Sequence, residues 1–195
     1  THAEDAELAA KALRAASVRM ADREACAERL AKTLDEAPIA ARVAIIETLG
    51  EMGGSTALAA VGRIGKSGEK QIQDAATRVL GEWMTIDAGP VLLELATDPK
   101  SSYRVRALRG YLRLPRQFGR QMSDEQRVVM CRNGWDSAER DDERELVLEV
   151  MERYPSNAML QLAQDLAACG TLSDKAAVVV EELERQLNSG TAEDK

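Results

Sequence analysis

A run of basic residues in the middle of the chain is the sequence feature most suited to binding chemistry. Between positions 100 and 120 there are seven Lys or Arg residues and no Asp or Glu. Arg106, Arg109 and Arg113 follow a three-four spacing, which places their side chains on one face of a helix. Such a row of guanidinium groups could bind phosphates or another anionic group. Segment 100–120 is therefore a candidate anion-binding surface.

Residues that usually carry catalysis or bind metals are scarce. His2 is the single histidine, which removes most histidine-based chemistry. The three cysteines, Cys26, Cys131 and Cys169, are far apart and odd in number, so they predict neither a disulfide framework nor a zinc site. Cys131 has Arg132 beside it but no histidine near it in sequence to activate the thiol. We expect Cys26 and Cys169 to pack as small apolar side chains, and we predict no catalytic residue, cofactor or metal.

Two short motifs look like ligand sites but fit ordinary structure better. Segment 62–68 contains Gly-Lys-Ser, yet it lacks the earlier glycine and the preceding strand that a phosphate loop requires, so we interpret it as a turn. The acids at 141–143 lack EF-hand spacing and favour a solvated first turn of a helix.

The composition indicates helices packed through small side chains. The chain has 195 residues, a formal net charge of −7, 45% hydrophobic, 30% charged and 3% aromatic residues. This apolar content excludes intrinsic disorder, no apolar run is long enough to span a membrane, and the first residues do not form a signal peptide. Ala, Leu, Glu and Arg favour helices. We therefore predict a soluble all-α protein, cytoplasmic or periplasmic.

Glycine and proline divide the chain into short segments with helical periodicity. Ser123 with Gln126 predicts a capping box, and Ser156 predicts a helix start. Breaks are expected at Pro115 and Gly134, among others. The predicted helical segments are 4–18, 21–35, 39–52, 55–65, 69–84, 89–97, 101–114, 123–132, 139–153, 156–168 and 173–188.

An internal repeat determines the predicted fold. The segment ARVAIIETLG at 41–50 is similar to segments at 72–81, 103–112, 143–152 and, more weakly, 175–184. The copies are about 31 to 40 residues apart, the period of stacked helix pairs. In this register, apolar residues form three rows, each facing one side of its helix. The rows are Ile45, Ala76, Ala107, Val147 and Val179; Leu49, Leu80, Tyr111, Met151 and Leu183; and Met52, Trp83, Leu114 and Tyr154.

With an apolar residue, an Arg, an Ala and a Leu-Gly ending in register, the chain resembles HEAT-type (armadillo-like) helical repeats. The resemblance implies a right-handed α-α superhelix, a HEAT-like solenoid of about five helix pairs over 21–188. It makes 4–19 an N-terminal partial repeat or cap within a single domain over 1–190, and the polar residues 189–195 predict a disordered tail. A further similarity to HEAT-type domains of large multidomain bacterial proteins implies that the chain is part of something longer.

The family often carries an Arg near the start of each second helix. Arg42, Arg104 and Arg144 occupy this position. The resemblance implies that each Arg bonds an acid or a carbonyl in the turn between the paired helices, with Asp35 and Asp98 as expected partners.

The repeat register offers a second interpretation of the basic segment. Arg109 aligns with acids in three copies and with Arg78 in a fourth, and the row of Arg113 also mixes signs. Such rows favour ladders of surface ion pairs between successive second helices, each worth about 0–1 kcal/mol. Trp83 falls in a core row, whereas Trp135 has no repeat equivalent and either caps the core or anchors a partner. The candidate partner-binding residues are Arg78, Arg106, Arg109, Arg113 and Trp135.

A solenoid without catalytic groups favours a non-enzymatic scaffold or protein-interaction module. We expect it to bind a protein partner, or a flanking domain of the same chain, on a concave wall of second helices. The alternatives are a HEAT-like enzyme, a nucleic-acid or anion-binding variant that uses segment 100–120, and a structural spacer between catalytic domains. The negative net charge disfavours nucleic acid, no membrane partner is expected, and the oligomeric state stays open.

Overall fold

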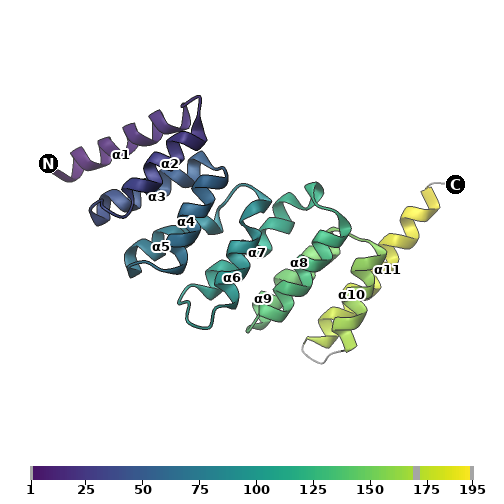
Figure 1. The fold of residues 1–195 in the computed structure, drawn as a ribbon. Helices are drawn as coiled ribbons and strands as arrows, with labels where there is room; N and C mark the ends of the chain where they lie inside the picture. The colour runs from purple at the N-terminus through teal and green to yellow at the C-terminus, as the bar shows by residue number, and fades with distance from the viewer. Residues whose placement is uncertain (1, 169–171, 194–195) are drawn as a thin grey trace. The chain divides into compact units, whose positions relative to one another are not determined.

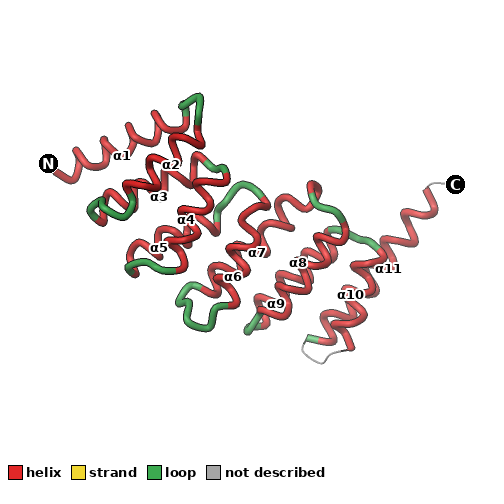
Figure 2. The backbone as a smooth tube through the Cα atoms, viewed as in Figure 1, coloured by secondary structure: helices red, strands yellow, loops and turns green. Residues whose placement is uncertain are grey.

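The computed structural model describes residues 2–168 and 172–193. Within these ranges the chain is helical and contains no β-strand, which confirms the all-α prediction (Figures 1 and 2). No helix in the same ranges is both long enough and apolar enough to cross a membrane. The helices are α1 (His2–Val18), α2 (Arg23–Thr33), α3 (Ile39–Met52), α4 (Ser55–Lys66), α5 (Lys70–Gly81), η1 (Ile86–Ala88), α6 (Gly89–Thr97), α7 (Arg104–Phe118), η2 (Gly119–Gln121), α8 (Asp124–Ser137), α9 (Asp141–Arg153), α10 (Asn157–Ala168) and α11 (Ser173–Glu193).

The five repeat copies fall on α3, α5, α7, α9 and α11, each of which follows a partner helix. The chain divides into two compact units, residues 1–110 and 111–195, and α7 passes from one to the other. In unit 1, α2 packs on α4 and α4 on α6, while α1 packs on α3 and α3 on α5. In unit 2, α8 packs on α10 and α9 packs on α11. First and second helices thus form separate layers in each unit, as in an α-solenoid; the single domain over 1–190 stays a prediction.

The predicted apolar rows form the core between the layers. The ten residues of the first two rows are all buried, from Ile45 and Leu49 in α3 to Val179 and Leu183 in α11. In the third row Met52, Trp83 and Leu114 are buried, but Tyr154 is half-buried. The Tyr154 hydroxyl donates to the carbonyl of Arg116 at 3.4 Å, and this bond holds the ring near the surface.

Two predicted helix breaks are wrong, because packing overrides the local signals. The helix α8 continues through Gly134 to Ser137, and a Cβ at Gly134 would lie 2.5 Å from Cδ2 of Leu112. The helix α7 continues through Pro115 to Phe118, with Leu114 and Pro115 both buried. Gly134 therefore permits close packing rather than ending a helix, and burial around Pro115 offsets the backbone hydrogen bond that proline cannot donate.

The C-terminal helix is longer than expected. The helix α11 runs to Glu193, so residues 189–193 are helical where a disordered tail was predicted. The Ser189 hydroxyl donates to the carbonyls of Arg185 and Gln186 at 2.9 and 3.0 Å, a bonding pattern compatible with a continuing helix. Residues 194 and 195, and the predicted apolar packing of Cys169, lie outside the described residues.

The predicted caps and turn arginines are confirmed. Ser123 and Gln126 form a capping box, and the Ser156 hydroxyl accepts a hydrogen bond from the backbone N–H of Met159 at 3.1 Å. Arg42 donates to the carbonyls of Ala37 and Asp35, both at 2.7 Å.

The same bonding recurs at the next repeats. Arg104 donates to the carbonyl of Ala96 at 3.1 Å, and Arg144 to that of Ala138 at 2.7 Å. Each of these arginines donates to a carbonyl, and Arg42 and Arg144 also pair with the carboxylates of Glu69 and Asp141. Of the two predicted acids, Asp35 pairs its carboxylate with Arg63, and the Asp98 carboxylate accepts a hydrogen bond from the backbone N–H of Lys100.

A carboxylate from one repeat caps the first helix of the next. The Glu24 carboxylate in α2 accepts hydrogen bonds from the backbone N–H groups of Ser55 and Thr56, at 3.0 and 3.1 Å, at the start of α4. The hydrogen bonds from Thr56, and then those from Ser55, lower the pKa of the Glu24 carboxyl below its usual value of 4.5. The ionised carboxylate is therefore stabilised in the folded chain.

This cap predicts a pH-dependent stability difference. A carboxyl with a lowered folded-state pKa contributes stability above the unfolded pKa and loses it as the pH falls through the folded pKa. We expect the wild type to have a higher free energy of unfolding than Glu24→Gln at pH 7, and the gap to close toward pH 3. Urea titrations of both proteins at the two pH values, followed by circular dichroism, measure this. A gap that is constant across this range would contradict the assignment.

Candidate partner-binding groove

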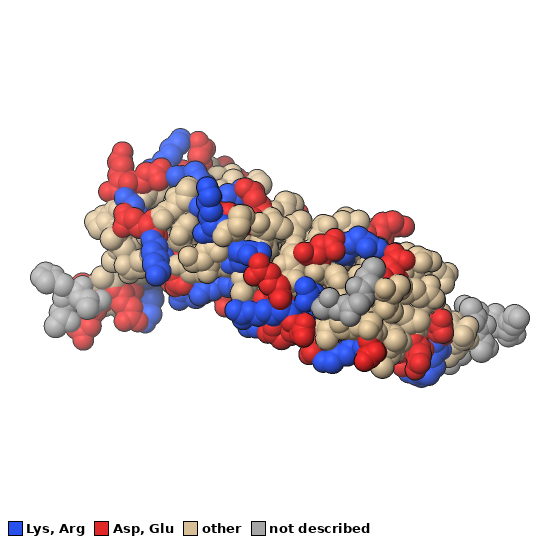
Figure 3. Space-filling view, turned by 90° about the horizontal axis from the view of Figure 1, so that it is seen from below, with Lys and Arg blue, Asp and Glu red and all other residues tan. Residues whose placement is uncertain are grey.

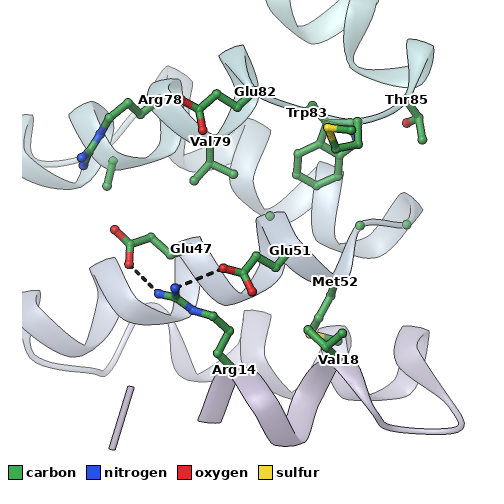
Figure 4. Close-up of a pocket in the computed structure, with 15 residues that line it drawn as sticks. Arg14, Val18, Glu47, Glu51, Met52, Arg78, Val79, Glu82, Trp83 and Thr85 are labelled. Atoms are coloured by element: carbon green, nitrogen blue, oxygen red, sulfur yellow. Dashed lines mark hydrogen bonds and ion pairs between the residues drawn. The ribbon is translucent and has the colours of Figure 1, made fainter. Parts of the chain in front are cut away.

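A groove lies on the second-helix layer of unit 1, between α1, α3, α5 and the turn that follows α5 (Figure 4). Its volume is about 850 Å³, which falls within the range of ligand-binding clefts. We call it the unit 1 groove. It is lined by Arg14, Val18, Glu47, Gly50, Glu51, Met52, Gly53, Gly54, Ala75, Arg78, Val79, Glu82, Trp83, Met84 and Thr85.

Glycines within α3 and in the turn that follows it shape the groove. A Cβ at Gly50 would overlap the Val79 side chain, so α3 and α5 approach closely along the floor. After α3 the chain turns at Gly53, with φ +66°, and Gly54, with φ +90°, a conformation that L side chains rarely adopt. Both glycines line the groove where the chain turns after Met52.

One end of the groove is apolar. Met52 and Trp83 form its inner surface, and Val18 lies against Met52 from α1 (Figure 4). Trp83 is only 3% exposed, which confirms its predicted place in the core, and its small exposed part belongs to the groove lining. Met84, by contrast, is 64% exposed. An exposed thioether beside a buried indole provides a surface that can adapt to an apolar side chain.

The other end carries charges of both signs. Arg14 in α1 bridges Glu47 and Glu51 in α3, at 3.0 and 3.1 Å, and Figure 4 shows both pairs. Across the groove, α5 supplies Arg78, whose nearest acid is Asp74 at 3.7 Å, one turn earlier in the same helix.

Glu82, the residue that follows α5, is the third acid in the lining. Its exposed carboxylate has no hydrogen-bond or ion-pair partner within residues 2–168 and 172–193. The lining thus contains two Arg and three Glu side chains.

Of the predicted partner-binding residues, only Arg78 lines this groove. Arg106 lies in α7 and is engaged with α5: it donates to Asp74 Oδ1 at 2.8 Å and to the Thr77 hydroxyl at 3.0 Å. Its guanidinium also stacks 5.2 Å from the Tyr103 ring centroid.

The other two predicted arginines of segment 100–120, Arg109 and Arg113, fall in different units. Arg109 is exposed on the unit 1 part of α7, while Arg113, in unit 2, donates to Gln117 in its own helix. The five predicted residues do not form one site, and their role in binding stays a prediction.

Trp135 takes the core position that the sequence left open. It is 9% exposed in α8, and the guanidinium of Arg144 lies 5.9 Å from its ring centroid. An indole covered to this degree offers little surface to a partner, so the geometry favours core packing.

Ion pairs join successive second helices, and two of them are made by Arg106 and Arg116, which lie outside the predicted rows of Arg109 and Arg113. Arg106 pairs with Asp74 at 2.8 Å in unit 1, and Arg116 pairs with Glu149 at 3.0 Å in unit 2. On the face drawn in Figure 3, basic and acidic residues are interspersed rather than gathered in one basic patch. Further pairs between neighbouring repeats are Arg63–Asp35, Lys66–Glu94, Arg132–Asp165 and Lys175–Glu145.

Reactive and metal-binding chemistry is limited in the described residues. No group of three or more His, Cys, Asp or Glu side chains in residues 2–168 and 172–193 is placed to hold a metal ion. Burial raises the pKa of the Cys131 thiol to about 12, although Arg127 acts in the opposite direction. At neutral pH this cysteine is therefore a buried thiol rather than a nucleophile.

The two described cysteines are expected to differ in their reactivity toward an alkylating agent. We expect iodoacetamide at pH 8 to modify the half-buried Cys26 in the folded chain and to leave Cys131 unmodified, because Cys131 is fully buried and protonated. Peptide mass mapping measures both sites, and unfolding in urea serves as the control in which both react. Equal rates in the folded protein would contradict the burial of Cys131.

Most of the groove could not be identified from sequence. Trp83 carried only the signal of a core position, and Met84 fell within a predicted helical segment that ends early, since α5 stops at Gly81. The available signal was Gly50 in register with Gly81, which indicates close helix approach but not an open cleft.

Comparison with known proteins supports the architecture. Residues 27–113 match the family of HEAT repeats, a span from α2 to the middle of α7. The search of curated proteins gave no match, and neither did the search of solved structures. HEAT repeats commonly serve as protein-interaction scaffolds. The repeat register, the two helical layers and this match agree on the architecture: residues 27–113 match HEAT repeats, and the described helices on either side of this span continue the same layered packing.

Proposed function

We propose that this chain is a non-enzymatic protein-interaction module and that a segment of its partner binds in the unit 1 groove. The observation that carries the proposal is Met84, a large apolar side chain that is 64% exposed at the mouth of a groove with an apolar inner end. Exposed apolar surface next to a polar rim is typical of protein-binding sites. The match of residues 27–113 to HEAT repeats, which commonly serve as protein-interaction scaffolds, supports the same function.

The geometry favours the groove over the basic segment as the binding surface. Arg104 and Arg106 donate to unit 1 groups, and Arg116 pairs with Glu149 in unit 2. An anionic partner would have to compete with these bonds. The partner is a separate protein or a flanking domain of a larger bacterial chain, two sources that one experiment distinguishes.

Photo-crosslinking tests the proposal in the cell of origin. A benzophenone amino acid at position 84 is expected to form adducts with a protein or with a flanking segment, whereas the same group at Val129, 56% exposed in α8, is not. Thr85→Trp, which fills the apolar end from an exposed position, should abolish the adducts, and Val129→Trp should not.

The charge-reversed variant Arg109→Glu/Arg113→Glu tests the alternative that the partner binds to the basic segment 100–120. If this variant abolishes adduct formation while Thr85→Trp leaves it intact, the basic segment is the binding surface and the groove is not. Adducts that depend on neither change would place the binding surface elsewhere and overturn the proposal.

A further inference from the structure

We propose that the unit 1 groove selects a peptide segment that carries an apolar anchor with a Lys or Arg within about one helical turn of it. This inference rests on the proposed function and adds the chemistry of the partner. It follows from how the groove divides into an apolar end and a charged end, and from which of its charges are already paired.

The apolar end fits a single unbranched or aromatic side chain. Val18, Met52 and Trp83 line it (Figure 4), and Met84, which is 64% exposed, belongs to the same lining. The thioether of Met84 has rotatable bonds that let it fold over an anchor and bury it, and burial of an apolar side chain contributes most of the affinity of such contacts.

Neither arginine in the lining is well placed to bind an acidic ligand. The two terminal nitrogens of Arg14 are paired with Glu47 and Glu51, and these two ion pairs hold the side chain in this orientation. A ligand carboxylate at Arg14 would therefore displace two ion pairs and approach two acids. Arg78 pairs with Asp74 in its own helix at 3.7 Å, and Figure 4 shows it across the groove from α3, the helix that carries Glu47.

Glu82 is the charge that a ligand can satisfy. Its carboxylate is exposed and without a partner in the described ranges, and it lines the groove on the same side as Trp83, with the carboxylate turned toward Val79 (Figure 4). A cationic side chain close to the anchor would pair with Glu82 while the anchor contacts Trp83. With a formal net charge of −7, the whole chain also attracts cationic segments.

Selection from a random peptide library displayed on phage tests the inference with the intact chain. We expect the enriched peptides to share a Leu, Met or Phe with a Lys or Arg three or four positions away. Synthetic versions with Glu in place of the basic residue should bind about tenfold more weakly by fluorescence anisotropy, because they place like charges opposite Glu82.

Charge reversal in the protein provides the reciprocal test. Glu82→Lys should weaken the basic peptides about tenfold and should leave the fold intact, since Glu82 is the C-cap of α5, where a cation is favourable. Glu184→Lys is the matched control, because it reverses an exposed acid in unit 2 that also has no partner in the described ranges.

The outcomes separate this inference from the proposed function. Enriched acidic or uncharged peptides that are lost with Thr85→Trp would overturn the charge preference and leave the groove as a binding site. Peptides that bind regardless of Thr85→Trp and Glu82→Lys, or a selection without enrichment, would overturn both.

Discussion

Replacing Gly110 with alanine is expected to lower the free energy of unfolding of unit 1 by about 1–3 kcal/mol, the range of overpacking in a close contact. Gly110 lies in α7, where a Cβ would be 2.8 Å from the Cα and 3.4 Å from the carbonyl oxygen of Gly81 in α5. Both neighbours are backbone atoms, which cannot rotate away as a side-chain end can. The helices would therefore have to move apart.

The other side of this contact gives a matched control. A Cβ at Gly81 would meet only Cγ of Arg106, at 4.0 Å, which is ordinary van der Waals contact. Gly81→Ala is thus expected to change the stability by about 0 to +1 kcal/mol, because alanine restricts the unfolded chain and favours helix. The same substitution on two facing glycines should act with opposite signs.

Trp83 provides the local probe for this pair. It is buried in unit 1, so its fluorescence in a Trp135→Phe background follows the unfolding of that unit in urea. Equal stabilities for Gly110→Ala and Gly81→Ala would show that α5 and α7 are not packed backbone to backbone at this point.

The features that could be predicted from sequence depend on local chemistry. Helix positions followed from the 3.6-residue period, and the cap at Ser123 followed from a side chain that bonds the backbone three residues away. The bonds of Arg42 reach only five to seven residues along the chain, so position within a repeat is enough to predict them.

The features that could not be predicted depend on contacts between distant residues. Whether Gly134 ends a helix or admits a neighbour is decided by Leu112, which belongs to another helix. The groove depends on Gly50 facing Val79 and on the early end of α5, which leaves Met84 exposed. A periodic pattern identifies the buried face of each helix, but it does not indicate where neighbouring helices leave a groove between them.

The contact between Leu112 and Gly134 leads to the second large expected effect. Leu112→Ala removes a fully buried side chain from unit 2 and should cost about 2–5 kcal/mol. Gly134→Ala alone should cost about 1–3 kcal/mol, because its methyl group would lie 2.5 Å from Cδ2 of Leu112 and 3.4 Å from Cγ2 of Val147.

The two substitutions together are expected to cost less than the sum of their separate effects, by about 1 kcal/mol or more. Leu112→Ala removes the atom that obstructs the new methyl group, and the methyl group fills part of the cavity that Leu112 leaves. Val179→Ala, which truncates a buried residue of α11, is the control and should combine additively with Gly134→Ala. Urea unfolding followed by Trp135 fluorescence in a Trp83→Phe background measures all variants in unit 2. Additive effects for Leu112 and Gly134 would mean that α7 and α8 do not meet at this glycine, and that Gly134 has no role in bringing them together.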